Sequence, residues 1–336
     1  MKNTITTLSM ALLFWASVTE ASGETATDRK PAAQYLFIIV VNGVRYDDAL
    51  GNKNHLYTEN IWNKLRPLGT ICTKFYNREL TYPIPAQMSL LTGVWHVFEN
   101  PLSENIRPAY PTLFEYWKKE KSTDSCYFAS SKKTLEILTH SDQKAYGKAY
   151  APVFEANASV SVDTMFREGK TEVTENAIYE KALAYIFKHH PPFVYLNLGS
   201  GAGDEWAKYP HECRLPGQKD SCGGADLLNA YYESIILLDA IVFDLWDRIQ
   251  HDDLYREQSV FIVLSDHGRH TNDFHGFGDN CRGCQQLNFL AIGPGIKKDF
   301  VSKKERTLID VCRTVGTIFG IPTPLAKGTI MKEMLE

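Results

Sequence analysis

Four short apolar runs recur along the chain, and each of them stops at or close to a Gly, Asn or Asp residue. The runs are too short for helices and are rich in Val, Ile, Phe and Tyr. Continuous apolar runs of this length are typical of strands that are buried on both faces of a parallel sheet. The pattern predicts strands at residues 36–41 (LFIIVV), 193–198 (FVYLNL), 260–264 (VFIVL) and 287–292 (LNFLAI).

Between these runs, apolar residues recur at helical spacing. The clearest stretch covers residues 225–250, where an apolar side chain returns every three or four positions. A second helix is predicted at 174–190, before a Pro-Pro pair, and a third at 306–320, which ends in Gly320. Strands that alternate with helices predict an α/β fold with a mostly parallel central sheet flanked by helices.

The first residues have the layout of a secretory signal peptide. One Lys precedes an apolar stretch from Leu8 to Val18, and small residues follow. This stretch is too short to span a bilayer as a helix. We therefore expect a signal peptide at 1–23, a mobile tail at 24–34, and one α/β domain at 35–336. The mature chain is then expected to be secreted or periplasmic, without a transmembrane segment.

Composition narrows the possible partners. The 336 residues are 44% hydrophobic and 23% charged, which is ordinary for a globular protein. The net charge is −4 and no long basic run occurs, so no nucleic-acid-binding surface is expected. The oligomeric state cannot be predicted from these features.

Seven cysteines follow the predicted signal peptide, and in an exported protein they can form disulfides. Cys213 and Cys222 bracket a loop that contains Gly and Pro, which favours a local disulfide. Cys281 and Cys284 form a Cys-Arg-Gly-Cys segment, which predicts either a tight disulfide or half of a metal knot. No second Cys-x-x-Cys segment occurs, so the zinc knot is the weaker alternative. The other three are expected as small core residues: Cys72, Cys126 and Cys312.

Polar residues follow three of the predicted strands, at the edge where ligands bind in open parallel sheets. Asp266 and His267 end the third strand, and His275 comes eight residues later. Asp204 follows the second strand in a Gly-rich segment, and Asn42 follows the first. Carboxylate and imidazole ligands suit zinc or a similar divalent ion, and an amide oxygen can join them.

Each of these residues also has a structural alternative. Asp266 and Asn42 can form turns, and His275 can be a surface loop residue. Arg45 can hold an anionic substrate in bidentate fashion, or it can pair with Asp47 or Asp48. Two further histidines, His211 and His270, are expected to face solvent rather than a metal.

The order of these segments resembles the alkaline phosphatase superfamily, from about residue 36 to residue 322. IIVVNGVRYDD is similar to the first metal segment of that superfamily, and LTYPIPAQMSLLTG is similar to its nucleophile segment. GDEWAKY, SDHG and the later HG are similar to the remaining ligand segments. The resemblance implies a metal-dependent hydrolase that acts on anionic esters.

The resemblance also implies roles for individual residues. It implies two divalent metal ions, zinc in the first place, with manganese or calcium as alternatives. Asp266 and His267 would hold the ion that activates the nucleophile, and Asp204 and His275 would hold the other. Thr81 is the expected nucleophile, with Asn42 at a position where the superfamily has an Asp.

Three departures support a different function. Asn42 removes one negative charge, Lys208 stands where the second segment would place its His, and the usual nucleophile position falls on Pro83. His211 can substitute for the missing His if the loop bends. Sulfatase activity is less favoured than phosphatase or phosphodiesterase activity, because the C/S-x-P-x-R segment of sulfatases is absent.

Two main hypotheses follow. The first is an exported metal-dependent hydrolase of phosphate esters, or less favourably sulfate esters, that acts through a metal-bound Thr81. The second is a catalytically degenerate member that acts as a binding or scaffold protein with one metal or none. A one-metal phosphotransferase is a third, weaker alternative.

Overall fold

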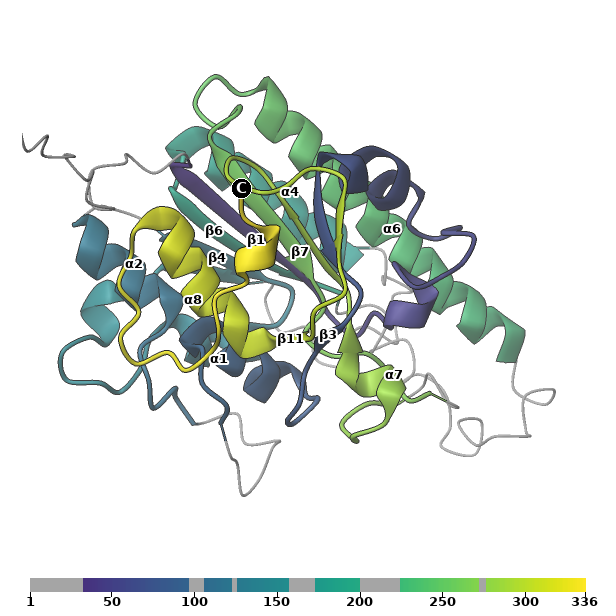
Figure 1. Ribbon diagram of the computed structural model, residues 1–336, viewed down its shortest axis with the longest axis horizontal. Coiled ribbons are helices and arrows are strands. Elements are labelled where there is room, and N and C mark those ends of the chain that lie inside the picture. Colours follow the sequence, from purple (N-terminus) through teal and green to yellow (C-terminus); the bar gives the residue numbers. More distant parts are fainter. Residues whose placement is uncertain (1–32, 97–105, 123–125, 157–172, 200–223, 272–275) are drawn as a thin grey trace, which may run out of the picture. The chain divides into compact units, whose positions relative to one another are not determined.

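The computed structural model describes residues 33–96, 106–122, 126–156, 173–199, 224–271 and 276–336 (Figure 1). Side chains at 173–176 and 224–230 are not included in that description. By internal contacts the chain divides into residues 1–30 and 31–336, and all of the described residues belong to the second unit. The predicted signal peptide and most of the predicted tail lie outside the described residues.

A central sheet of eight strands organises the fold, in the order β10-β2-β9-β7-β1-β6-β4-β5. Five neighbouring strands, β7-β1-β6-β4-β5, are parallel, whereas β9 runs antiparallel to both β7 and β2. The mostly parallel sheet flanked by helices that the sequence predicts is therefore confirmed. The strands of this sheet are β1 (Tyr35–Val41), β2 (Gly69–Cys72), β4 (Cys126–Ser130), β5 (Val153–Ala156), β6 (Phe193–Leu198), β7 (Ser259–Leu264), β9 (Phe289–Ile292) and β10 (Phe300–Ser302).

The two faces of the sheet carry separate hydrophobic cores, because alternate residues of a strand point to opposite faces. Leu36, Ile38 and Val40 of β1 belong to the first core, with α1 (Pro83–Thr92), α2 (Leu113–Lys121) and α8 (Leu308–Phe319). The intervening residues of β1 belong to the second core, with α4 (Val173–His189) and α6 (Gly224–His251). Figure 1 shows these two helical layers on opposite sides of the sheet.

Three of the four predicted strands are found within one residue of their predicted bounds, as β1, β6 and β7. The fourth run is divided at Asn288 into β8 (Gln286–Leu287) and β9. The side-chain amide of Asn288 donates to the carbonyl of Val44 and accepts from the backbone N–H of Leu50. The backbone N–H of Asn288 donates to the hydroxyl of Ser265. These bonds to neighbouring loops take the backbone out of the central sheet.

The remaining elements are short. A second sheet of three strands consists of β3 (Phe75–Tyr76), β8 and β11 (Arg306–Thr307). The short helices are η1 (Tyr46–Asp48), η2 (Ile61–Leu65), η3 (Arg66–Leu68), η4 (Lys133–Thr139), η5 (Lys148–Tyr150), α7 (Arg282–Gln285) and η8 (Lys332–Met334). Among the helices in the described part of the chain, none combines the length and apolar character that crossing a membrane requires.

Candidate metal centre and active site

The carboxyl ends of β1 and β7 bring Asn42 and Asp266 together. The two strands are parallel neighbours with Val40 opposite Leu264, so the chains leave the sheet side by side two residues later. Gly43 has a φ of +72°, and a Cβ built there would lie 3.6 Å from Cε1 of His267. That distance is an ordinary contact, whereas the positive φ is a backbone conformation that residues other than glycine rarely adopt, so the turn after β1 favours glycine.

Asp266 is fully buried, and neutral groups hold its carboxylate. Its Oδ2 accepts from Nε2 of Gln87 at 2.8 Å, and its Oδ1 accepts from the backbone N–H of His267 at 2.9 Å. Gln87 lies on α1, and the same Nε2 also donates to Oδ1 of Asn197 at the end of β6. A carboxylate buried among neutral donors is costly unless a cation compensates its charge.

His267 is also buried, and its two ring nitrogens have different surroundings. Nδ1 lies 2.8 Å from the carbonyl oxygen of Gly268, which can only accept, so Nδ1 carries the proton. Nε2 has no hydrogen-bond partner among the described residues and lies 3.8 Å from Oδ1 of Asp266. Burial lowers the pKa of His267, which favours the neutral ring. A neutral imidazole whose Nδ1–H is held by a carbonyl is the usual form of a metal-ligating histidine.

Asn42 completes this donor set. Its side chain is buried, and the Nδ2 atom has no hydrogen-bond partner in the described part of the protein. A half-turn of the terminal amide exchanges its nitrogen and oxygen, which places the oxygen at this unbonded position. We call Asn42, Asp266 and His267 the strand-end site. One carboxylate, one neutral imidazole and one amide, two of them with an unpartnered buried atom, fit a divalent cation.

The predicted second metal cannot be placed on described residues. Asp204 and His275 both lie outside the described residues, and so do Lys208 and His211. Their roles as ligands, or as departures from a ligand set, stay predictions.

Thr81 lies two residues before α1, with its hydroxyl bonded to a backbone group. Its Oγ1 donates to the carbonyl of Asp279 at 2.8 Å. Asn77 connects this segment to the strand-end site, because its Nδ2 donates to the carbonyls of both Leu80 and Asp266. Pro83 is the first residue of α1 and has no hydroxyl to offer at the position where the superfamily has its nucleophile.

Arg45 is bound within the protein. Its Nε and Nη2 contact the two carboxylate oxygens of Asp48 at 2.5 and 2.9 Å. Its Nη1 donates to the carbonyls of His270 and Thr271, both at 3.2 Å. Of the two alternatives for Arg45, the structure has the pairing with Asp48. The bonds from Nη1 to His270 and Thr271 hold the loop after β1 against the loop after β7.

Sequence reasoning missed Gln87, and it missed the cations beside His267. Lys132, which follows β4, and Arg269 each contribute to the lowered pKa of His267 through their positive charge. Arg269 is buried, and its Nε donates to the carbonyl of Gly43 at 3.1 Å. A polar Gln87 within the mostly apolar IPAQMSLL stretch is a signal that sequence reasoning could have used, although the sequence does not identify its partner.

The cysteine predictions need one correction. Cys281 and Cys284 are free thiols, so the expected disulfide between them is not formed. Both sulfur atoms instead face Nδ1 of His270, at 3.9 and 3.5 Å. His270 therefore does not simply face solvent, as the sequence suggested. Cys213 and Cys222 lie outside the described residues, and the three expected core cysteines are buried and free: Cys72, Cys126 and Cys312.

The family model for sulfatases matches residues 35–321, which is most of the chain. The protein therefore belongs to the sulfatase family, within the alkaline phosphatase superfamily that its segment order resembles. Members of this family are generally hydrolases that depend on divalent metals. Comparison of the sequence with curated proteins gives no match.

Solved structures share the fold at low sequence identity. A phosphonate monoester hydrolase from Silicibacter pomeroyi is 15% identical with a TM-score of 0.63, covering 90% of this chain and 76% of that one. The phosphonate monoester hydrolase of Agrobacterium radiobacter is 12% identical with a TM-score of 0.62, covering 90% and 77%. A protein in the alkaline phosphatase superfamily from Vibrio parahaemolyticus is 15% identical with a TM-score of 0.59, covering 90% and 71%.

Proposed function

We propose that this protein is a metal-dependent hydrolase of anionic esters, phosphate esters before sulfate esters. The observation that carries the proposal is the lone pair on Nε2 of His267, which is buried beside the Asp266 carboxylate and has no hydrogen-bond partner among the described residues. Asp266, His267 and Asn42 would hold a divalent cation. When bound, such a cation polarises a phosphoryl or sulfuryl oxygen and offsets the charge that develops on it.

The surroundings of the site favour an anionic substrate. Lys132 and Arg269 are close enough to His267 for their charge to lower its pKa. Positive charge at this edge of the sheet would attract and orient a phosphate or sulfate group. Because Arg269 already donates to the Gly43 carbonyl, Lys132 is the stronger candidate for direct contact with the substrate.

Thr81 is the proposed nucleophile, and the hydrogen bond of its hydroxyl must break before the hydroxyl can attack an ester. Asp279 offers a carbonyl oxygen, which accepts a hydrogen bond but cannot take up the proton. For an attack on the ester, the hydroxyl has to leave this carbonyl and lose its proton to another group. The second cation, held by Asp204 and His275, and export through residues 1–23 belong to the same proposal.

A second candidate function has a specific observation in its favour. The hydroxyl of Thr81 is bonded to Asp279 and the helix begins with Pro83, which leaves no free threonine or serine hydroxyl among the described residues just before α1. The same donor set could then serve a protein that binds a metal and an anionic ligand without cleaving an ester.

The test is hydrolysis of nitrophenyl phosphate, bis-nitrophenyl phosphate and nitrophenyl sulfate by the full chain with zinc, manganese or calcium. Metal-dependent turnover that disappears in Asp266→Ala supports the hydrolase. Thr81→Val then tests the nucleophile, with Thr317→Val as a matched control, since Thr317 is exposed and its hydroxyl also donates to a carbonyl. Metal binding at Asp266 without turnover of any ester would instead support the binding protein.

A further inference from the structure

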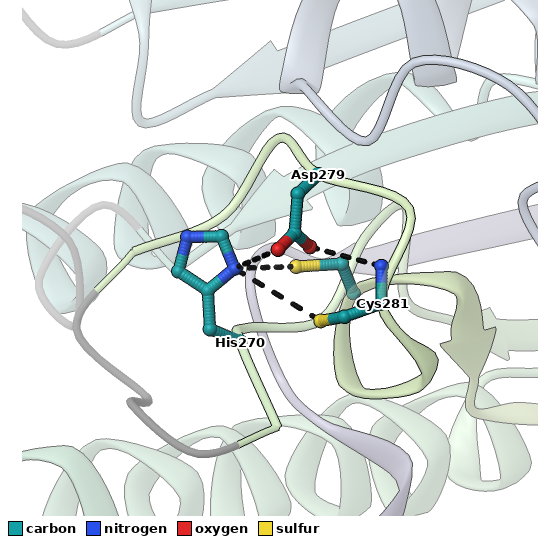
Figure 2. A group of neighbouring side chains, drawn as sticks. His270, Asp279 and Cys281 are labelled. Atoms are coloured by element: carbon teal, nitrogen blue, oxygen red, sulfur yellow. Dashed lines mark hydrogen bonds and ion pairs between the residues drawn. The ribbon is translucent and has the colours of Figure 1, made fainter.

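Four potential metal ligands converge outside the strand-end site, on the loop after β7 and the start of α7. They are His270, Asp279, Cys281 and Cys284, and one ligand atom from each lies within 4.8 Å of all the others. We call this group the loop cluster. Figure 2 shows the imidazole, the carboxylate and the two sulfur atoms facing one another. Within the described residues it is the one group of this kind with His, Cys, Asp or Glu ligands.

We propose that the loop cluster is a structural zinc site. Two thiolates, one imidazole and one carboxylate are the ligand types of tetrahedral zinc. With zinc bonds of about 2.3 Å to sulfur and about 2.0 Å to nitrogen or oxygen, neighbouring ligand atoms stand roughly 3.3–3.8 Å apart. The two sulfur-to-nitrogen distances in the cluster, 3.5 and 3.9 Å, are close to that spacing.

Hydrogen bonding alone does not account for this arrangement. Three groups approach the same atom, Nδ1 of His270: Oδ2 of Asp279 at 2.9 Å and the sulfurs of Cys281 and Cys284. A single ring N–H is well aligned with one acceptor, so the other two gain little from it. A cation in their midst would bind all four groups. It would also spread the His270–Asp279 pair by a few tenths of an ångström.

The backbone around the cluster is built to hold the ligands in place. The N–H of Cys284 donates to the carbonyl of Cys281 at 3.1 Å, which fixes the two thiols on one short turn. The backbone N–H of Cys281 also holds Oδ1 of Asp279 at 3.0 Å, and this leaves Oδ2 for the cluster. A Cβ on Gly276 would lie 2.6 Å from the ring of His270, so the loop packs on the imidazole only because this residue is glycine.

A disulfide is the competing arrangement, and the geometry disfavours it. Both cysteines are free, and each sulfur is in contact with the imidazole of His270. The carboxylate of Asp279 has no role in a disulfide, whereas it is a normal fourth ligand for zinc. The proposed zinc would join His270 to Asp279 and so stabilise the loop whose Asp279 carbonyl holds Thr81.

The first experiment measures metal content per chain by mass spectrometry, on full-length protein purified without chelator. We compare the wild type with Cys284→Ala, with Asp266→Ala, and with Cys312→Ala as a buried cysteine outside the cluster. The expected result is that Cys284→Ala loses about one equivalent of zinc and Cys312→Ala loses none, because Cys284 supplies one of the two thiolates of the proposed site. The zinc that remains in Asp266→Ala separates this site from the strand-end site.

The second experiment uses the folded wild type, so that it does not depend on the variant folding. Thiol alkylation is followed by peptide mapping, with and without a strong chelator. Cys281 is partly exposed, so we expect it to be protected as prepared and labelled after chelation.

Either of two results would overturn the proposal: equal labelling of Cys281 in both conditions, or a Cys281–Cys284 disulfide in the intact mass. Unchanged zinc content in Cys284→Ala would do the same. If no ester is hydrolysed but zinc is found in the loop cluster, the zinc site is supported and the proposed hydrolase function is rejected.

Discussion

The strand-end site and the loop cluster have nearest ligands only three positions apart, His267 and His270, yet they are built in opposite ways. The strand-end site takes its residues from two strands far apart in the sequence, and the hydrophobic cores hold it. The loop cluster takes its residues from one segment of 15 positions, 270–284, and short-range turns hold it. The first is buried, whereas Asp279 of the second is exposed.

This difference favours different roles for the two proposed metals. A site at the carboxyl end of a parallel sheet lies at the edge where substrates bind, and its ligands are held rigidly by the strands. A local cluster with two thiolates has the composition of a closed structural site. Loss of the metal at the strand-end site should therefore abolish catalysis, whereas loss of the metal at the loop cluster should lower the stability of the fold.

The largest expected effect is that of Asp266→Ala on ester hydrolysis. Groups that merely orient a metal ligand are worth about 10–100-fold, so loss of the ligand itself should cost more than about 100-fold in kcat/KM. The comparison requires that zinc in the loop cluster is retained in this variant. Activity within tenfold of the wild type would show that the strand-end site is not the catalytic centre.

Gln87→Leu should have the next largest effect, because Gln87 positions Asp266 rather than touching substrate. Its Nε2 donates to Oδ2 of Asp266 at 2.8 Å, and its Oε1 accepts from Tyr195 at 3.0 Å. We expect metal affinity at the strand-end site to fall about 10–100-fold, with activity restored at saturating metal. Gln250→Leu, at the end of α6, is the matched control. An unchanged metal affinity in Gln87→Leu would contradict this role.

The two sites also differ in how far the sequence could predict them. Apolar runs that end in polar residues define the carboxyl edge of a parallel sheet, and that rule brought Asn42, Asp266 and His267 together without a structure. In the sheet β1 lies between β6 and β7, so the residues that follow these strands lie next to one another. Long-range order was predictable here because buried parallel strands have few alternatives.

The loop cluster was not predictable in this way. The Cys-x-x-Cys segment was visible, but its partners depend on how a loop turns back on itself. The N–H of His270 donates to the carbonyl of Gly276, and the N–H of Arg269 donates to the carbonyl of Gly283. No hydrophobic period marks such turns, so His270 was expected in solvent and Asp279 was not considered. The hydroxyl contact of Thr81 with the same loop escaped prediction for the same reason.

Lys132→Ala should have a smaller effect, confined to the strand-end site. If its ammonium contacts the anionic group of the substrate, its loss should raise KM about tenfold, the lower end for a charge-assisted hydrogen bond. Lys133→Ala is the control, since Lys133 is the exposed neighbour. The difference between the two variants should shrink at high salt. Equal KM values for both variants would remove Lys132 from the binding site.

Arg282→Ala should have the smallest effect, although Arg282 stands between the two cysteines of the loop cluster. Its guanidinium contacts Gln286 at 3.0 Å and Asp47 at 3.2 Å, and the pair with Asp47 is exposed on both sides. Exposed ion pairs contribute roughly 0.2–1 kcal/mol, so thermal unfolding should shift by no more than a few degrees. Zinc content should not change, because the ligand atoms and the backbone turn remain. A loss of zinc as large as that in Cys284→Ala would mean that the ion pair to the loop after β1, and not the local turn, holds the cluster together.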